Sequence, residues 1–255
     1  MDMPKLVKIK KIVDENEKVK TFFLDTKLDV KPGQFIMVWI KGVDEKPFSL
    51  SSVKGDIAVT VEVKGEFTRA MFKLEVGDEV GIRGPYGNGY SAEKGAVVVA
   101  GGLGLAPLKP LIGKISGVEV VYGAKTKDVL IFKDMIEKFD VCTDDGSFGE
   151  KAFTTDILER KLKGGKVSIV YACGPEVMLL KVFEVCEKYS VDCEVSLERY
   201  MKCGFGVCAQ CVCEDQMVCK DGPVFGSDML RGMSEFGKSA RLKSGKLVSL
   251  KEYYG

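Results

Sequence analysis

The chain has 255 residues, of which 45% are hydrophobic and 29% charged, and its formal net charge at pH 7 is +1. Such a composition is typical of a globular protein with two compact domains and a small further module, and the near-neutral charge argues against electrostatic binding of nucleic acid. No apolar run is long enough to cross a bilayer and no signal peptide is recognised, so a cytoplasmic protein without membrane contacts is expected. The absence of histidine excludes a histidine general base, a histidine–zinc site and a Rieske cluster, so the chemistry must depend on cofactors.

Residues 1–92 are predicted to form an antiparallel β-barrel. β-Branched and aromatic runs recur at short intervals, separated by turn residues such as Lys31-Pro32-Gly33. The clearest runs cover residues 19–24, 34–40 and 57–63. Closely spaced strands with little helix between them are typical of a small antiparallel barrel.

Two stretches of this region have side chains suited to a phosphate-bearing ring cofactor. Lys46-Pro47-Phe48-Ser49 combines a cation for a phosphate, an aromatic ring and a hydroxyl, although an edge strand without a ligand would look the same. Gly65-Glu66-Phe67-Thr68 precedes a helical pattern over residues 69–74, whose N-terminus could cap a second pyrophosphate. The glycine-rich segment 84–89 is interpreted as a turn at the domain boundary, most simply a linker.

From about residue 93 onward, strands and helices alternate. Ala96 to Ala100 is a continuous apolar run, as in strands that are buried on both faces of a parallel sheet. Further strands are predicted over residues 118–122, 140–143 and 167–172, and helices over 129–139 and 175–189. The alternation predicts a doubly wound α/β domain with a parallel sheet over residues 93–200.

Two strand-to-helix turns of this domain are candidate sites for a pyridine nucleotide. The first carries Gly101, Gly102, Gly104 and Pro107, and the second carries Cys173, Gly174 and Pro175. Glycines let the backbone approach a pyrophosphate, and a helix N-terminus supplies free N–H groups. The first turn departs from G-x-G-x-x-G, and such turns often serve only tight packing. Because ligands bind at the carboxyl ends of parallel strands, both turns are expected to face one nicotinamide.

Several residues near these turns have an alternative structural interpretation. Cys173 either touches the nicotinamide ring or is a buried thiol of no special reactivity. Asp144 and Asp145 follow a predicted strand and either bind ribose or form a turn. The other cysteines of the domain are predicted to be buried thiols without a role, namely Cys142, Cys186 and Cys193.

The segment 203–219 carries the strongest chemical signal in the chain. Cys203, Cys208 and Cys211 have the spacing C-x4-C-x2-C, and Cys219 follows after seven further residues. Thiolates gathered this closely need a soft metal centre to neutralise their repulsion. The spacing is that of plant-type [2Fe-2S] clusters, and the glycines between the cysteines let backbone N–H groups point at sulfur.

Three questions about this C-terminal part, residues 201–255, stay open. Structural zinc is an alternative, although zinc sites usually have two C-x2-C knuckles and this segment has one. A disulfide framework does not suit an odd number of cysteines without a secretory signal. Cys213 is predicted to be a non-ligand, but it could exchange roles with Cys219. The tail, residues 232–255, is expected to be a loosely ordered extension or a partner contact.

The order of these motifs resembles the ferredoxin–NADP reductase superfamily, and within it the electron-transfer subunits of NAD-dependent dihydroorotate dehydrogenases. The resemblance covers about residues 5–226, and its most specific part is the ending Cys-x-Asp-Gly-Pro-Val-Phe at residues 219–225. The other matching segments are residues 32–35, 46–49, 84–89, 101–107, 122–124, 173–175 and 201–204.

The resemblance implies a flavin barrel, a domain for NAD(H) as co-substrate and a [2Fe-2S] module. FAD, with FMN as a minor alternative, would be bound by Lys46, Pro47, Phe48, Ser49, Thr60, Val61, Glu62, Phe67 and Thr68. Two of these residues depart from the family. The family usually has arginine at the position of Lys46, and lysine cannot form the same bidentate hydrogen bonds with a phosphate. It usually has glycine at the position of Phe67, so the local backbone there must differ.

The resemblance also implies an electron path and a partner. A nicotinamide exchanges a hydride and a cluster exchanges one electron, so a flavin between them must do both. The partner would be the FMN-containing catalytic subunit that oxidises dihydroorotate in UMP biosynthesis, in a heterotetramer of two chains of each kind. Phe205 and Val207 are candidate contacts for it.

Two other functions compete with this one. The flavin subunits of sulfide dehydrogenases, sulfhydrogenases and ferredoxin:NADP oxidoreductases share the order of motifs and differ in their partner. The third hypothesis, from a different class, is a zinc-stabilised binding module.

Overall fold

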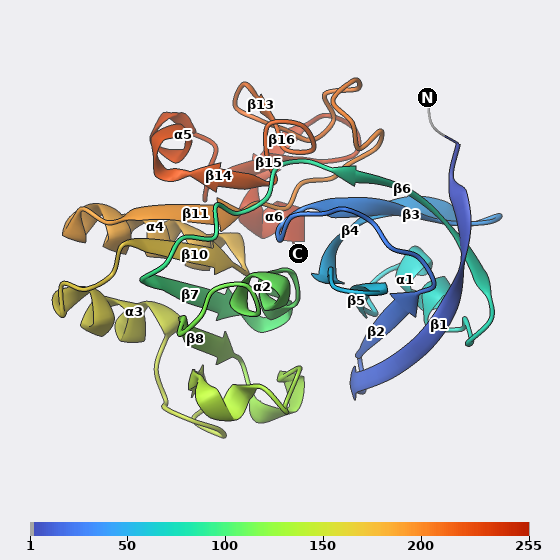
Figure 1. Ribbon diagram of the computed structural model, residues 1–255. Helices are drawn as coiled ribbons and strands as arrows, with labels where there is room; N and C mark the ends of the chain where they lie inside the picture. The colour runs from blue at the N-terminus through green and yellow to red at the C-terminus, as the bar shows by residue number, and fades with distance from the viewer. Residues whose placement is uncertain (1–2, 255) are drawn as a thin grey trace.

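The computed structural model of the chain describes residues 3–254. It consists of an antiparallel β-barrel, a mostly parallel sheet covered by helices and a small cysteine-rich region at the C-terminal end. Figure 1 shows the barrel on the right, the sheet on the left and the C-terminal region across the top of both. The fold class expected from the sequence is confirmed.

Six strands close the barrel in the order β1-β2-β5-β4-β3-β6. They are β1 (Lys5–Asn16), β2 (Val19–Leu24), β3 (Phe35–Ile40), β4 (Asp44–Ser52), β5 (Ile57–Glu62) and β6 (Glu79–Tyr86). Alternate side chains fill the interior because successive residues of a strand point to opposite faces, and Ile36, Val38 and Val59 belong to this core.

The helix α1 (Glu66–Met71) follows β5 and buries Phe67 and Met71 against the barrel. The helix was expected at residues 69–74, and this boundary is wrong. The hydroxyl of Thr68 accepts hydrogen bonds from the backbone N–H groups of Lys64 (2.8 Å) and Gly65 (3.0 Å), so the helix begins one residue after Gly65. A side chain that satisfies the free N–H groups in front of a helix fixes its first turn.

The second sheet has the strand order β14-β11-β10-β7-β8-β9. Its strands are β7 (Ala96–Gly101), β8 (Glu119–Ala124), β9 (Asp140–Thr143), β10 (Ile169–Cys173), β11 (Asp192–Ser196) and β14 (Val224–Gly226). All neighbours run parallel except β14, which is antiparallel to β11. Since β14 lies beyond residue 200, the C-terminal region completes the sheet of the domain before it.

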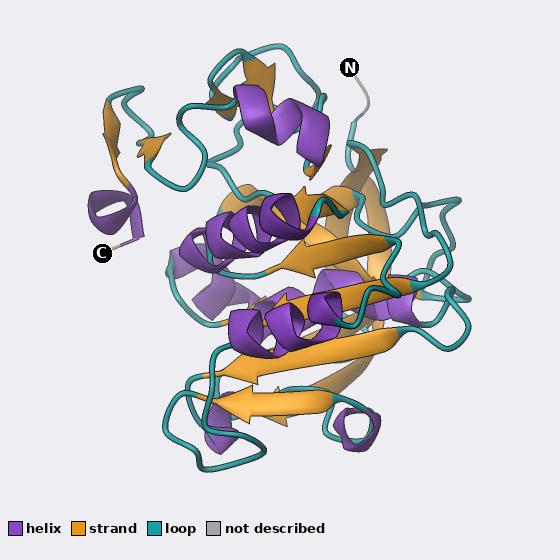
Figure 2. Cartoon of the chain, turned by 90° about the vertical axis from the view of Figure 1, so that its left-hand side faces the viewer, coloured by secondary structure: helices purple, strands orange, loops and turns teal. Residues whose placement is uncertain are grey.

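Helices cover both faces of this sheet. The short 3₁₀ helix η1 (Gly102–Gly104) leads into α2 (Leu105–Ile112), which packs on one face, and α3 (Thr154–Lys163) and α4 (Glu176–Tyr189) pack on the other. Figure 2 shows helices lying along the strands of the sheet, with the C-terminal region above them. This is the layering of a doubly wound domain.

One predicted helix of this domain is absent. Residues 129–139 contain only the last residue of one 3₁₀ turn, η2 (Lys127–Val129), and a second single 3₁₀ turn, η3 (Ile136–Lys138). Phe132 lies between them with φ of +53°, a conformation that an α-helix of L-residues cannot contain. Its backbone N–H donates to the Glu15 carboxylate of the barrel (3.0 Å). The apolar side chains of this segment therefore pack into the core without a continuous helix.

The described part of the C-terminal region is built of short strands and helices, so of the two alternatives left open for the tail the structure does not support a loosely ordered extension. Its elements besides β14 are β12 (Val212–Cys213), β13 (Gln216–Met217), α5 (Ser227–Gly232), β15 (Ser239–Arg241), β16 (Leu247–Ser249) and α6 (Leu250–Tyr254). Within residues 3–254, no helix combines the length and the apolar character that a membrane span requires.

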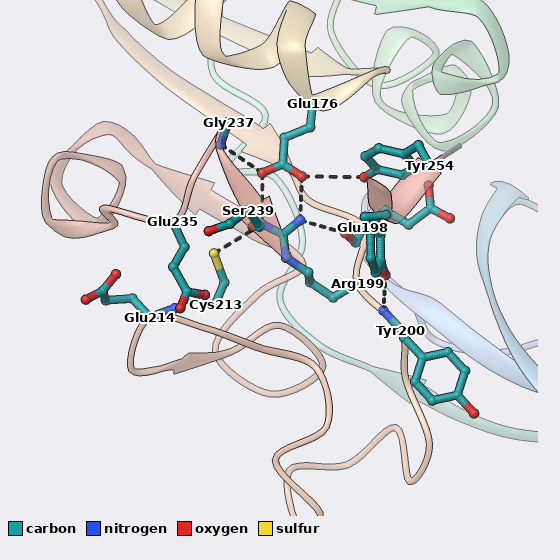
Figure 3. A network of polar contacts seen from close by, with 11 residues as sticks. Glu176, Glu198, Arg199, Tyr200, Cys213, Glu214, Glu235, Gly237, Ser239 and Tyr254 are labelled. Atoms are coloured by element: carbon teal, nitrogen blue, oxygen red, sulfur yellow. Dashed lines mark hydrogen bonds and ion pairs between the residues drawn. The ribbon is translucent and has the colours of Figure 1, made fainter. Parts of the chain in front are cut away.

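A buried ion pair between Arg199 and Glu176 lies where the sheet domain meets this region, and further bonds of both side chains reach across the boundary (Figure 3). The two side chains are 1% and 2% exposed, and Arg199 Nη2 lies 2.8 Å from Glu176 Oε1. Glu176 also accepts hydrogen bonds from the Gly237 backbone N–H (2.9 Å) and the Tyr254 hydroxyl (3.4 Å). Burial disfavours the charge of Arg199, but the Glu176 carboxylate keeps its pKa above the ordinary value. One carboxylate at the start of α4 thus holds two segments of the tail.

We expect Glu176→Gln and Arg199→Met each to lower the free energy of unfolding by about 3–5 kcal/mol, because either change leaves a buried charge without its partner. Urea unfolding followed by circular dichroism measures this. The double variant should lose less than the sum of the two single variants. Arg160→Gln, which breaks an exposed pair with Glu150, is the control and should cost far less, because water and salt screen an exposed pair. An equal loss in Glu176→Gln and the control would contradict the expectation.

Candidate functional site

The two candidate binding regions meet where the barrel faces the sheet. Strand β4, which carries Lys46 to Ser49, contacts helix α2, which follows the glycine loop. Figure 1 shows β4 and α2 on facing sides of the junction. The fold therefore gathers the flavin and nucleotide candidates at one interdomain junction.

The first group of predicted flavin residues lies along β4 and α1. Lys46, Pro47, Phe48 and Ser49 are half-buried on β4. The Lys46 ammonium pairs with the Asp44 carboxylate and lies 5.8 Å from the ring centroid of Tyr200. The rings of Phe48 and Phe67 stack with centroids 5.8 Å apart and an interplanar angle of 29°. The structure thus brings the two rings together, with Phe67 buried in the barrel core and Phe48 half-buried against it.

The side chains of the second group are already engaged. Val61 belongs to the barrel core, and Glu62 forms an ion pair with Lys64 at 2.9 Å. The Thr60 hydroxyl is buried and bonds to the hydroxyls of Ser51 (2.8 Å) and Thr21 (2.9 Å). For Thr60 and Val61, this leaves the backbone as the part that could reach a flavin. The Thr68 hydroxyl is occupied by the start of α1.

The two strand-to-helix turns of the sheet domain are in direct contact. A Cβ added to Gly104 would lie 2.2 Å from the carbonyl oxygen of Cys173, and one added to Gly174 would lie 3.0 Å from Cα of Gly101. Tight packing therefore explains the glycines at 104 and 174, because any side chain there would collide with backbone. Gly102 differs, since its φ is +53° and a Cβ there would meet no atom within 4 Å.

The remaining residues of these two turns differ in their exposure to solvent. Pro107 is buried inside α2, whereas Pro175 is exposed at the start of α4. Gly102 and Pro175 are thus the residues of the two turns best placed for a nucleotide. Burial raises the pKa of the half-buried Cys173 thiol to about 12, so this group stays protonated at neutral pH. It cannot serve there as a thiolate nucleophile.

The residues with an alternative structural interpretation are also placed. The Asp145 carboxylate accepts hydrogen bonds from the backbone N–H (3.0 Å) and the hydroxyl (2.6 Å) of Ser147, which lowers its pKa and closes a turn. The three other cysteines of the sheet domain, Cys142, Cys186 and Cys193, are buried.

The four predicted cluster cysteines lie on one loop, in two neighbouring pairs. In each pair the two thiols lie close enough for one to affect the pKa of the other, Cys208 that of Cys203 and Cys219 that of Cys211. Backbone N–H groups point at the sulfurs: Val207 N lies 3.4 Å from Cys203 Sγ, and Cys219 N lies 3.4 Å from Cys211 Sγ.

The local backbone makes these N–H contacts possible. Gly204 and Gly206 both have φ of +82°, which favours glycine, and the N–H of Gly206 lies 3.2 Å from Cys219 Sγ. Burial opposes ionisation of Cys203, but the backbone N–H groups of Cys208, Val207 and Phe205 lower its pKa to about 6. Donors that stabilise thiolates suit a soft metal centre.

The donor set fits an iron–sulfur group. The four sulfurs are the only soft donors that the loop presents together, and each pair has N–H groups directed at it. Over residues 3–254, no three cysteine, aspartate or glutamate side chains are already gathered as a metal site. A bound cluster would have to draw the two pairs together.

Cys213 points elsewhere. It is fully buried on β12, and its sulfur lies 3.3 Å from Nη2 of Arg199, within the ion-pair network of Figure 3. Burial raises the pKa of this thiol. The geometry favours Cys219 over Cys213 as the partner of Cys211.

The contacts that hold the cysteine loop against the barrel were not found from the sequence. Arg83 of β6 donates from Nη2 to the backbone carbonyl of Cys203 (3.1 Å) and forms two hydrogen bonds with Glu45 of β4. The Glu45 carboxylate raises the pKa of Arg83 against the effect of burial. Asn88 donates from its backbone N–H to Gly222 O (2.6 Å) and from Nδ2 to Asp221 O (2.8 Å).

No local sequence pattern predicts these contacts, because 120 residues separate Arg83 from Cys203 and 133 residues separate Asn88 from Asp221. Segment 84–89, interpreted as a linker, contains the end of β6, and its remaining residues pair through the backbone with residues 221–223. A pocket of about 390 Å³ lies beside the loop, lined in part by Trp39, Phe205 and Cys208.

Comparison with known families gives two matches. The iron-sulfur cluster binding domain of dihydroorotate dehydrogenase B matches residues 198–231, and the oxidoreductase FAD-binding domain matches residues 5–90. These ranges cover the cysteine loop and the barrel.

Similar proteins extend over the whole chain. A probable dihydroorotate dehydrogenase B (NAD(+)), electron transfer subunit, from Methanocaldococcus jannaschii is 46% identical over 97% of this chain and 99% of its own length. The protein of the same name from Pyrococcus horikoshii is 45% identical over 98% of this chain and all of its own.

Among solved structures, a chain of an NADH-dependent reduced ferredoxin–NADP oxidoreductase aligns over 100% of both chains, with a TM-score of 0.77 and 27% identity. The FAD/NAD-binding domain of a nitric oxide dioxygenase from Vibrio cholerae covers 75% of this chain and 98% of its own, with a TM-score of 0.63 and 21% identity, and so shares the fold. With the full-length identity to the archaeal proteins, these matches show that the chain belongs to the family of dihydroorotate dehydrogenase B electron transfer subunits, which are oxidoreductase subunits.

Proposed function

We propose that this chain carries electrons between a partner's flavin and NAD, using an FAD at the barrel–sheet junction and a [2Fe-2S] cluster on the cysteine loop. The observation that supports this most strongly is that the loop is bonded to the barrel through Arg83 and Asn88. A cluster held there would lie beside the flavin domain. Bound flavin would supply hydride exchange with a nicotinamide and single-electron exchange with an iron–sulfur centre.

The residues of the chain have distinct tasks in this proposal. The half-buried ring of Phe48, backed by the buried ring of Phe67, offers an aromatic face to the ring system of FAD, and Lys46 offers a cation to its phosphates. Gly102 and Pro175 would contact the nucleotide, next to the N-termini of α2 and α4. Cys203, Cys208, Cys211 and Cys219 hold the iron.

The catalytic partner binds at the exposed side of the cysteine loop in this proposal. Val207 is 73% exposed, and Cys208 is also exposed. The archaeal relatives are named as electron transfer subunits of an NAD(+)-dependent dihydroorotate dehydrogenase. We infer an FMN-containing dihydroorotate-oxidising subunit as the partner, in a heterotetramer of two chains of each kind that serves UMP biosynthesis. Dihydroorotate itself would bind to the partner.

Single serine variants of the cysteines test the cluster assignment. We expect Cys203→Ser, Cys208→Ser, Cys211→Ser and Cys219→Ser each to lose most of the bound iron and the visible iron–sulfur absorbance, because each removes a thiolate ligand. Cys213→Ser is the matched control and should retain both. Two irons and two sulfides per chain are expected in the unaltered protein. A colourless protein with one zinc per chain would support the zinc-stabilised module instead.

Aspartate variants of two glycines test the nucleotide site. We expect Gly102→Asp to weaken NADH binding at least about tenfold, because a carboxylate would face the pyrophosphate at a helix N-terminus. Gly117→Asp is the control, since Gly117 also has a positive φ and open space at Cβ but lies outside both turns. Fluorescence titration with NADH measures the affinities. Equal affinities in the two variants would rule out this site.

Coexpression with candidate partners separates the two electron-transfer functions. We expect a stable complex with an FMN-containing dihydroorotate dehydrogenase subunit that reduces NAD when dihydroorotate is added. The similarity to the ferredoxin–NADP oxidoreductase chain keeps ferredoxin as the second candidate electron donor. NAD(P) reduction by reduced ferredoxin, with no dihydroorotate-dependent activity in the complex, would favour that second function.

A further inference from the structure

We propose that Arg83, held by Glu45, is a positioning residue that sets the reduction potential of the iron–sulfur centre by placing a nearly buried guanidinium against the Cys203 carbonyl. This inference rests on the function proposed above. It assigns a role to two residues that lie outside the cysteine motif.

The Arg83–Glu45 pair has a fixed geometry. Arg83 Nε lies 2.8 Å from Glu45 Oε1, and Nη2 lies 2.5 Å from Oε2. The two side chains are 9% and 20% exposed. Two parallel charge-assisted hydrogen bonds orient the planar guanidinium far better than a single contact would.

The same guanidinium contacts the cysteine loop on its other side. Nη2 donates to Cys203 O at 3.1 Å, and the guanidinium carbon lies 5.6 Å from the ring centroid of Phe205. The Tyr86 hydroxyl accepts a hydrogen bond from Nη1 of Arg83 at 3.2 Å. The ring centroids of Tyr86 and Phe205 lie 6.3 Å apart. Backbone and ring contacts together fix the first cluster ligand relative to the barrel.

Arg83 differs from the other cations near the loop in its burial. Lys202 is adjacent to Cys203, and the Lys220 side chain approaches Gly206, but both lysines are exposed to water. Water and salt screen an exposed charge strongly, whereas a nearly buried charge acts through a medium of lower dielectric constant. Arg83 also keeps its charge at every accessible pH.

The charges of the pair act on the cluster in opposite directions. One-electron reduction adds one negative charge to the cluster, which a nearby cation stabilises and a nearby anion destabilises. Arg83 donates a hydrogen bond to the loop, and the hydrogen bonds of the Glu45 carboxylate go to Arg83. The positive end of the pair therefore faces Cys203.

Redox titration of neutralised variants, followed by the paramagnetic signal of the reduced cluster, tests this role. We expect Arg83→Gln to lower the equilibrium constant for cluster reduction about tenfold, which is ~59 mV for one electron. Glu45→Gln should raise it, because the guanidinium loses its counter-charge. Arg83→Lys keeps the charge and should stay within about threefold of the unaltered protein.

A purely structural role for the pair predicts a different result. Loosening the loop by either substitution would expose the cluster and move the potential in the same direction for both variants, which would overturn the proposal. Arg160→Gln and Glu150→Gln alter an exposed ion pair of the sheet domain and are the controls. Shifts no larger than those of the controls would also overturn it.

Measured iron and flavin contents distinguish a failure of this inference from a failure of the proposed function on which it rests. If Arg83→Gln does not retain iron, Glu45→Gln and Arg83→Lys decide the outcome, and an unshifted potential in Glu45→Gln overturns the proposal. If the variants hold a normal amount of iron and their cluster potential does not shift, this inference is wrong but the proposed function stands. An unaltered protein that binds no iron defeats the proposed function as well.

Discussion

The docking of the cysteine-rich region onto the barrel is the constraint on which the rest of the structure depends. Arg83 and Asn88 donate hydrogen bonds to backbone carbonyls of Cys203, Asp221 and Gly222, at both ends of the cysteine loop. Strand β14 then joins the loop to the neighbouring sheet through β11. A loop that is held at both ends by two domains keeps its cysteines at a defined distance from the interdomain junction. Electron transfer between cofactors bound at these two places would require such a fixed distance.

The Arg199–Glu176 pair extends this constraint to the nucleotide side of the molecule. Glu176 stands at the start of α4, directly after the Cys173-Gly174-Pro175 turn, and its carboxylate binds groups of the tail. Arg199 reaches Cys213 on the β12–β13 hairpin, which lies between Cys211 and Cys219. The start of a candidate nucleotide-binding helix, the cysteine region and the C-terminal helix therefore share one buried network.

The sequence predicted what depends on local pattern and little of what depends on long-range contacts. Strand alternation predicted the barrel, and cysteine spacing predicted which thiols would lie on one loop. The helix at 129–139 failed because the apolar periodicity gave no sign that Phe132 would bond to Glu15 of the barrel. The order of the tail could not be decided from the sequence, because it comes from long-range contacts with Glu176 and from Tyr253, whose hydroxyl accepts the Tyr200 N–H at 2.7 Å. Arg83 and Glu45 carried no motif, since their importance arises only where β6 meets the loop.

Electron transfer between flavin and cluster within this single chain is the central claim, and anaerobic reduction of the isolated holoprotein by NADH tests it most directly. Freeze-quenched samples would be examined for flavin absorbance and for the paramagnetic signal of a reduced iron–sulfur centre. We expect the signal to develop as the flavin is reduced, in proportion to the bound iron. Complete reduction of the flavin with no paramagnetic iron signal, in a protein that holds its iron and whose cluster potential allows reduction, would contradict the claim.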